Sequence, residues 1–331
     1  MPSQTRLGGS LALPESESAP DCDVLAYLGG IPAYNPAMRR IAVINQKGGV
    51  GKTTTVCNLG AALAARARKV LAVDLDPQAH LTLHYGVEPP TNRPSTFDVL
   101  TAGTPVDKTA IKVRKNLWLL PSHTRLAGAE LELASAVGRD VILRDALAES
   151  RRHFDFVLID CPPSLGVLTL NGLSAAGEVI IPLQPHFLGL QGMSKLLETI
   201  TLVQRRINAD LRVAGVVLCM FEAGIRLTAE VADDLRKFLT SARGTNVPWA
   251  DAKLYDAVIR RNIKLAECPS YGMTIFDYEP RCNGALDYAR LAVEVLDLPA
   301  EVVPPTTHEM EKAPLRIDTP PASDSSIANI A

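Results

Sequence analysis

The chain has 331 residues, 47% of them hydrophobic, and a formal net charge of −2 at pH 7. This is enough to bury a large core in one or two domains, and the near-neutral total excludes a strongly polyanionic or polycationic protein. The charge is uneven, because residues 1–37 carry one basic and four acidic residues and residues 297–331 carry two basic and six acidic ones. The body between them therefore has a charge of +5. A mildly basic body permits nucleic-acid binding without proving it.

The cysteine pattern and the hydropathy of the chain limit the cellular compartments in which the protein is expected. The six cysteines include no C-x-x-C pair and no metal-like spacing, which predicts buried free thiols in a reducing compartment. No basic segment followed by an apolar one opens the chain, so secretion is not expected. The longest charge-free segment, residues 161–177, contains two prolines and three glycines and does not fit a membrane span. We therefore expect a cytoplasmic protein.

The elements predicted along the chain alternate between strands and helices. Composition predicts three segments: a flexible Pro-, Ser-, Gly- and Ala-rich N-terminal extension at residues 1–38, a folded domain at residues 39–298, and a disordered Pro-, Ser- and Thr-rich acidic tail at residues 299–331. Alternation with Val-, Ile- and Leu-rich strands predicts an α/β fold with a doubly wound, mainly parallel sheet. Strands are predicted at 41–45, 69–76, 116–122, 154–163, 178–185 and 213–220, and helices at 52–67, 140–151, 166–176, 189–206, 226–241 and 283–296.

The stretch "NQKGGVGKTTT" (45–55) joins the first predicted strand to the first predicted helix. It departs from the phosphate-loop pattern G-x-x-x-x-G-K-[ST], because Gln46 replaces the first glycine and Lys47 precedes the next two. Glycines let successive backbone amides face a phosphate at a helix N-terminus. Lys52 is predicted to reach the β- and γ-phosphates and the Thr53 hydroxyl to bind Mg²⁺. The predicted nucleotide-binding residues here are Lys47, Gly48, Gly49, Val50, Gly51, Lys52, Thr53 and Thr54.

Carboxylates follow two other predicted strands. Asp160 in "VLIDCPP" follows four apolar residues and fits a Walker-B aspartate that holds Mg²⁺ through water. Asp74 and Asp76 in "VDLDPQ" end another strand, and ligands of open α/β sheets bind at adjacent strand ends. Asp76 lies further into the loop and is the better candidate for positioning an attacking water. A capping or turn role stays open for these aspartates.

Four motifs together carry a family resemblance: "KGGVGKTT", "DLDPQ", "DFVLIDCPPSLG" and "RRNIKLAECPSYG". Over residues 39–298 the chain resembles the ParA/Soj partitioning ATPases of the deviant Walker-A P-loop group. The first motif is shared with MinD-like and nitrogenase-iron-protein-like members, whereas "DLDPQ" and "AECPSYG" favour the partition branch. The resemblance implies a P-loop NTPase fold, ATP hydrolysis with Mg²⁺ and an ATP-dependent homodimer.

The same resemblance gives particular residues a role. In similar proteins the lysine at the position of Lys47 reaches across a nucleotide-sandwich dimer to the phosphates of the other subunit, so we expect Lys47, Lys52 and Asp76 to be catalytic. A cation that enters in trans makes dimerisation depend on the bound triphosphate. Adenine contacts are implied for Met220, Arg261 and Asn262. Two departures lie nearby, since Ala79-His80 replaces a common Gly-Asn and Arg260 replaces a common proline.

Other functions share such a loop. A redox role like that of the nitrogenase iron protein needs two cysteines per subunit for a cluster, and only Cys161 is suitably placed. A MinD-like membrane switch needs a basic amphipathic C-terminal helix, whereas this chain ends in an acidic Pro-rich segment, so no membrane partner is expected. A P-loop metabolic enzyme needs a small-substrate pocket that the sequence does not reveal, and this alternative stays open.

Residues 200–270 contain eleven basic and eight acidic residues. By the resemblance, Arg226 aligns with an arginine that contacts DNA, and Arg205 and Arg206 lie near a second such position. Only 38 residues precede the first strand, too few for a helix-turn-helix domain, so we expect non-specific binding to duplex DNA. The resemblance further implies a ParB-type DNA-bound activator and a nucleoid-associated cytoplasmic protein that drives chromosome or plasmid partitioning. A protein cargo positioned over the nucleoid is the alternative.

Overall fold

A computed structural model describes residues 38–222 and 224–298, without the side chains of residues 187–191. A nine-stranded sheet runs through its centre in the order β3-β4-β2-β5-β1-β6-β7-β8, with β9 also paired to β7. All pairs are parallel except β3 with β4. The strands are β1 (Arg39–Val43), β2 (Val70–Asp74), β3 (Ile111–Arg114), β4 (Leu117–Leu120), β5 (Phe156–Asp160), β6 (Glu178–Leu183), β7 (Arg212–Phe221), β8 (Lys253–Leu254) and β9 (Ile259–Arg260).

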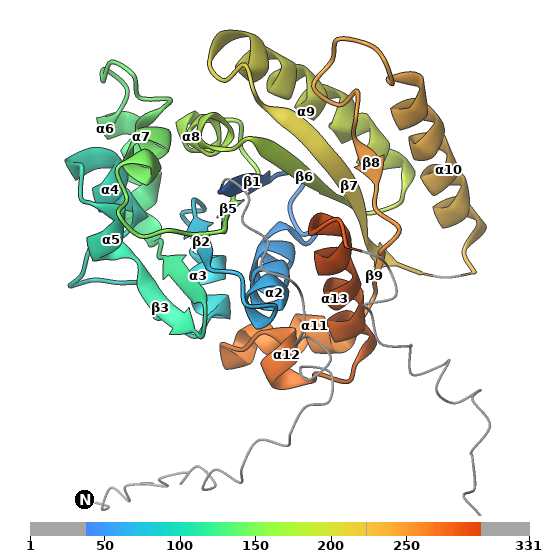
Figure 1. Ribbon diagram of the computed structural model, residues 1–331, viewed down its shortest axis with the longest axis horizontal. Coiled ribbons are helices and arrows are strands. Elements are labelled where there is room, and N and C mark those ends of the chain that lie inside the picture. Colours follow the sequence, from blue (N-terminus) through green and yellow to red (C-terminus); the bar gives the residue numbers. More distant parts are fainter. Residues whose placement is uncertain (1–37, 223, 299–331) are drawn as a thin grey trace, which may run out of the picture.

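Helices cover both faces of this sheet (Figure 1). One face carries α2 (Lys52–Ala65), α3 (His80–His84), α11 (Ile263–Glu267), α12 (Ile275–Tyr278) and α13 (Asn283–Val295), with the 3₁₀ turn η2 (Cys268–Tyr271). The other face carries α4 (Thr96–Ala102), α5 (Val106–Thr109), α6 (Ala129–Glu132), α7 (Ile142–Ala148), α8 (Val167–Ala175), α9 (Phe187–Arg206) and α10 (Arg226–Ser241), with the 3₁₀ turn η1 (Thr124–Gly128).

Strand periodicity explains the two layers. Successive side chains of a strand point to opposite faces. Thus Ile41 and Val43 pack into the core beneath α2 and α13, whereas Ala42 and Ile44 pack into the core beneath α8 and α9. Because both faces are covered, the central strands are apolar except at their ends, as expected of parallel sheets.

All six predicted strands and all six predicted helices are present, with ends that differ by a few residues, and the predicted doubly wound sheet is confirmed. The sequence did not reveal β3, β8 and β9 or the short helices α3 to α6, α11 and α12. These elements have two to seven residues, and elements this short show little periodicity, although β4 and α7, with four and seven residues, were predicted. The predicted extension 1–38 (except Met38) and tail 299–331 lie outside the described residues, so the boundaries of the domain 39–298 stay a prediction.

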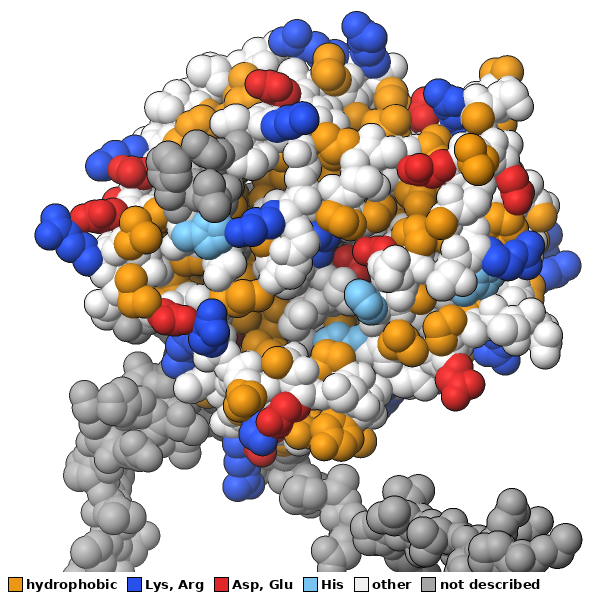
Figure 2. Space-filling view, turned by 180° about the vertical axis from the view of Figure 1, so that it is seen from behind, with side chains coloured by type: hydrophobic (Ala, Val, Ile, Leu, Met, Phe, Trp, Pro, Cys, Tyr) orange, Lys and Arg blue, Asp and Glu red, His pale blue; other side chains and the backbone are white. Residues whose placement is uncertain are grey.

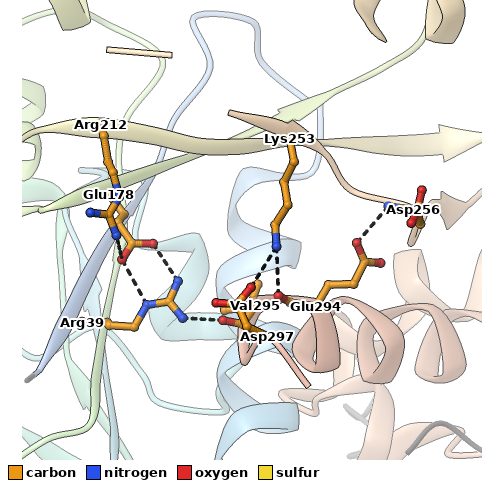
Figure 3. A network of polar contacts seen from close by, with 8 residues as sticks. All are labelled: Arg39, Glu178, Arg212, Lys253, Asp256, Glu294, Val295 and Asp297. Carbon is orange, nitrogen blue, oxygen red and sulfur yellow. Dashed lines mark hydrogen bonds and ion pairs between the residues drawn. The ribbon is translucent and has the colours of Figure 1, made fainter. Parts of the chain in front are cut away.

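A polar network lies at the edge where the parallel strands begin (Figure 3). The buried Glu178 carboxylate accepts hydrogen bonds from Arg39 Nε at 3.0 Å and Nη2 at 2.7 Å, and from Arg212 Nη2 at 3.1 Å. Arg39 Nη1 also donates to the Val295 carbonyl at the end of α13. The network therefore ties the first strand to the last helix of the described chain.

Candidate nucleotide-binding site

The phosphate loop lies between β1 and α2, at the edge where the parallel strands end, which we call the nucleotide edge. Gly49 and Gly51 have φ angles of 72° and 92°, in the left-handed region that a side chain strains. Gly51 directly precedes Lys52, the first residue of α2. The predicted loop therefore has the backbone that aims amides at an anion, and its glycines are needed for that shape.

The two lysines of the loop have different environments. Lys52 is buried, and its Nζ donates a hydrogen bond to the Lys47 carbonyl at 3.0 Å. Burial lowers the pKa of Lys52, while the charges of Asp160 and Asp76 oppose this shift. Lys47 is exposed, and its Nζ lies 2.7 Å from His186 Nε2. Lys52 is thus enclosed by the loop, whereas Lys47 is open to solvent.

Asp160 fits a site for Mg²⁺. Both of its carboxylate oxygens are buried without a hydrogen-bond partner among the described residues. Burial, and next the charge of Asp74, raise the pKa of Asp160 well above its usual range. The Thr53 hydroxyl is close enough to oppose this rise, although it lacks the geometry of a hydrogen bond. A buried, unpaired carboxylate beside a hydroxyl suits a hard cation, whose charge would neutralise developing charge on the phosphates.

The structure separates the roles of Asp74 and Asp76. Asp74 is fully buried and accepts hydrogen bonds from the Asp76 amide and from the amide and hydroxyl of Thr82. Burial raises its pKa to about 7. Asp76 is only partly buried and lines the cavity in front of the loop. Asp74 therefore holds the start of α3, and Asp76 faces the space that the phosphates would fill.

Two adjoining cavities fit a nucleotide. The first, of about 610 Å³, is the phosphate-side cavity. The second, of about 450 Å³, shares Gly51, Thr54 and Met220 with it and suits a flat base, so we call it the base-side cavity. Both volumes are in the range of small-molecule sites. The first is lined by Gly48, Gly49, Gly51, Lys52, Thr53, Thr54, Asp76, Gln78, His80, Leu83, His84, Pro163, Met220, Pro269 and Ser270. Lys47 and Val50 are not among its described lining residues.

The three residues implied in adenine contacts all line the second cavity. Met220 has a φ of 53°, Arg261 pairs with Glu222 at 2.6 Å, and the Asn262 side chain caps α11 by accepting from the Lys264 amide. The sequence did not point to the apolar walls, which come from Cys219, Ile259, Ile263, Leu265, Ala266 and Tyr288.

Both departures from the family pattern have a local structural consequence. Arg260, in place of a proline, forms an ion pair with the buried Asp287 of α13 at 2.6 Å and lines the base-side cavity. Ala79, in place of a glycine, has a φ of 54° as the residue before α3. Arg260 thus adds an ion pair to α13, whereas Ala79 leaves a Cβ in a strained backbone conformation.

Two further polar residues, Asn45 and His186, lie near the loop and were not predicted from the sequence. The buried Asn45 side chain accepts from the Lys47 amide at 3.0 Å and donates to the Pro182 carbonyl at 2.8 Å. His186 follows β6 and contacts Lys47. A polar residue that ends an apolar strand was a signal for Asn45. No local signal existed for His186, which lies 139 positions from Lys47.

The structure does not bring the three candidate DNA-binding arginines together. Arg205 and Arg206 are exposed at the end of α9, and Arg226 is exposed at the start of α10, where it pairs with Glu230 at 2.7 Å. The ten residues of β7 lie between them, a span of roughly 30 Å. On the face shown in Figure 2, lysine and arginine side chains are scattered among apolar and acidic ones rather than joined in one patch.

The remaining expectations concern cysteines, metals and membranes. Cys57, Cys161, Cys219 and Cys268 are buried free thiols, as predicted, while Cys22 lies outside the described residues. Within residues 38–222 and 224–298, no group of three or more His, Cys, Asp or Glu could hold a metal by itself. Mg²⁺ does not require such a cage, because phosphates and water supply most of its ligands. No helix in the same ranges is long and apolar enough to cross a bilayer.

Known proteins match this geometry. A family model described as an AAA domain matches residues 38–213. The chain is 42% identical to the sporulation initiation inhibitor protein Soj of Bacillus subtilis over 256 residues, covering 77% of this chain and 97% of that protein. It is 41% identical to the chromosome partitioning protein ParA of Caulobacter vibrioides over 265 residues, covering 79% and 95%.

A solved structure adds the cofactors. Cobyrinic acid a,c-diamide synthase from Mycobacterium smegmatis, with bound ADP and magnesium, is 36% identical with a TM-score of 0.66, covering 78% of this chain and 94% of that one. The predicted P-loop fold and the cofactors ATP and Mg²⁺ are thereby confirmed. With its phosphate loop, unpaired Asp160 and cavities sized for a nucleotide, the chain belongs to the Soj/ParA family of partitioning ATPases.

Proposed function

We propose that this ATPase is a nucleotide-dependent switch whose two ATP-bound copies form a sandwich dimer that binds DNA non-specifically and partitions a chromosome or plasmid. The observation that carries the proposal is the opposite placement of the two loop lysines. Lys52 lines the phosphate-side cavity, whereas Lys47 is exposed, is not among the described lining residues of that cavity, and contacts His186 instead. A cation presented outward from a nucleotide face can complete the site of a second copy.

Within this proposal each site residue has a distinct task. The glycines and Lys52 bind the phosphates, Thr53 and Asp160 hold Mg²⁺, and Asp76 orients the attacking water. The base lies against Met220 and the start of α11, with Arg261 and Asn262 at its rim. Lys47 supplies positive charge in trans, so only a triphosphate in both sites stabilises the dimer.

DNA binding is proposed to follow from dimerisation. Each subunit offers Arg226 at one end of β7 and the Arg205–Arg206 pair at the other, which are too few contacts for tight binding alone. A dimer doubles them on one body, and each neutralised phosphate adds a slope of about −0.9 in log affinity against log salt concentration. Binding should therefore require ATP and weaken steeply with salt. The proposal places the protein in the cytoplasm on the nucleoid, with a ParB-type DNA-bound protein that accelerates hydrolysis.

Lys47→Ala tests the dimer. We expect this variant to bind ADP like the parent protein but to remain monomeric with MgATP under non-hydrolysing conditions, because it lacks the trans cation. Size-exclusion chromatography with light scattering measures this, and Lys115→Ala, which removes another exposed lysine, is the control. Normal dimerisation of Lys47→Ala would defeat the trans role.

Fluorescence anisotropy on two unrelated duplexes tests DNA binding, with MgATP or MgADP at two salt concentrations. We expect similar affinities for both duplexes with ATP, weak binding with ADP, and weaker binding for Arg226→Glu and for Arg205→Glu combined with Arg206→Glu. The control is Arg151→Glu, which changes an exposed arginine outside the α9–α10 layer. A dimer that binds no DNA at low salt would favour a protein cargo or a small-substrate enzyme instead.

A further inference from the structure

The side-chain contact between Lys47 and His186 links the phosphate loop to the segment between β6 and α9. Lys47 Nζ lies 2.7 Å from His186 Nε2, and the two residues are 139 positions apart. We propose that His186 is a positioning residue that holds Lys47 away from its own phosphate-side cavity, ready for the nucleotide of a second copy. This inference rests on the proposed trans role of Lys47.

The backbone of Lys47 is already fixed on both sides. Its amide donates to Asn45 Oδ1 at 3.0 Å, and its carbonyl accepts from Lys52 Nζ at 3.0 Å. Asn45 also donates to the Pro182 carbonyl of β6 at 2.8 Å, so the loop and the end of β6 are joined by two separate contacts. With the backbone held, the direction of the Lys47 charge depends on its side chain alone.

A restraint on this side chain has a clear physical value. A lysine side chain carries about 2 kcal/mol of rotamer entropy, and an exposed one samples many directions. Lys47 begins the loop that surrounds the phosphates, so an unrestrained ammonium would be attracted to the phosphates of its own subunit. Neither Lys47 nor His186 is among the described residues that line the phosphate-side cavity. The contact therefore selects outward conformations and reduces the ordering cost of binding in trans.

The chemistry of the pair determines the role of the imidazole. An ammonium group has donors only, so in a hydrogen bond between these two groups His186 Nε2 is the acceptor. A glutamine at this position can also accept a hydrogen bond through its amide oxygen, whereas alanine cannot. If His186 had only a general structural role, the glutamine and alanine variants would not differ in this way.

The test measures the dissociation constant of the dimer by sedimentation, using the full chain and a non-hydrolysable ATP analogue with Mg²⁺. His186→Ala removes two Lys47–His186 hydrogen bonds per dimer, which should raise the dissociation constant of the dimer roughly tenfold. His186→Gln should stay within about threefold of the parent protein. His153→Ala, a change of an exposed histidine elsewhere, should leave it unchanged. All variants should bind the analogue as monomers within about twofold of the parent protein, and thermal melting checks that they fold.

The two single variants together separate this inference from the proposed function. If Lys47→Ala dimerises like the parent protein, the trans role itself fails. If Lys47→Ala is monomeric but His186→Ala dimerises like the parent protein, the trans role stands and the role of His186 is overturned. An equal loss in His186→Ala and His186→Gln would also overturn the inference.

Discussion

The two edges of the sheet differ in whether their buried carboxylates have hydrogen-bond partners. Where the parallel strands begin, Glu178 is buried but accepts three hydrogen bonds from two arginines, and Glu294 accepts from the amides of Asp256 and Ala257 (Figure 3). Where the strands end, Asp160 is buried with both oxygens unpaired. Buried polar groups are normally satisfied within the protein. Among the buried carboxylates of the described residues, Asp160 is the one with both oxygens unpaired, which indicates where a ligand completes the structure, whereas the paired Glu178 serves stability.

The largest expected effect concerns catalysis at the nucleotide edge. Asp160→Asn should lose the Mg²⁺-dependent part of ATP affinity, and Asp76→Ala should keep MgATP and the dimer. Each should hydrolyse ATP at least roughly 100-fold more slowly, since one loses the metal and the other the positioned water. Steady-state hydrolysis and nucleotide titrations with and without Mg²⁺ measure this, with the exposed Asp210→Ala as control. Parental hydrolysis by Asp76→Ala would contradict its assignment.

Asp160→Asn also tests the difference between the two edges, through its effect on stability. Burial and the charge of Asp74 raise the pKa of Asp160, so ionised Asp160 opposes folding when no cation is bound. Without nucleotide, Asp160→Asn should therefore be at least as stable as the parent protein. A loss of stability would mean that Asp160 has a partner in the fold.

At the opposite edge, removal of a buried acid should destabilise the protein without a direct effect on chemistry. Glu178→Ala leaves Arg39 without its carboxylate, and Arg39 is itself mostly buried. We expect a loss of about 2–3 kcal/mol in unfolding free energy, somewhat less than the roughly 3–5 kcal/mol of fully buried pairs, because Arg212 is well exposed. Denaturant unfolding measures this, with Glu178→Gln as the milder control. Nucleotide affinity that fell as much as stability would contradict the separation of the two edges.

The sequence could predict what lies in one short segment or on one long element. The phosphate loop, Asp76 and Asp160 follow strand ends, so their places were predictable from pattern alone, as were the six long strands. It could not predict contacts between distant segments, such as Lys47 with His186 or Arg260 with Asp287. Nor could the clustering of basic residues in the sequence reveal that β7 separates Arg205 and Arg206 from Arg226.

A further effect concerns acid stability at the nucleotide edge. His84 lies 3.5 Å from Cys268 Sγ and is buried, and this burial, with the charge of Arg114, lowers its pKa to about 4. Between pH 6.5 and 4 the unfolded chain binds a proton at His84 that the folded chain does not, so stability falls as pH falls through this window. The shift corresponds to a loss of about 3 kcal/mol once pH is below 4.

His84→Gln should remove this part of the acid sensitivity, whatever its effect on stability at pH 8. Denaturant unfolding at pH 8, 6, 5 and 4 measures the slope, and the exposed His153→Gln is the control. Equal slopes for His84→Gln and the parent protein would show that His84 titrates normally in the folded state.

The smallest expected effect compares one backbone feature at both edges. Ala79 at the nucleotide edge and Ala67 after α2 at the opposite edge both have left-handed φ angles, of 54° and 60°. A Cβ costs about 1–2 kcal/mol in this conformation, which a change to glycine removes. Glycine also loses more conformational entropy on folding than alanine does, and this loss offsets part of the stabilisation. Ala79→Gly and Ala67→Gly should therefore each stabilise the protein by about 0.5–1 kcal/mol, or roughly 2 °C in Tm.

The two glycine variants should differ in catalysis. The Ala79 amide donates a hydrogen bond to the carbonyl of Asp76 at 2.9 Å, so the strained residue contacts the backbone of the proposed water-positioning aspartate. Ala67, in contrast, follows the end of α2, at the opposite edge. Relaxed strain at residue 79 should shift the hydrolysis rate severalfold, and Ala67→Gly should leave it unchanged. Calorimetry with steady-state hydrolysis separates the outcomes, and Ala61→Gly inside α2 should instead destabilise by roughly 1 kcal/mol. If Ala79→Gly gained stability with an unchanged rate, the strain would be a tolerated substitution rather than part of the site.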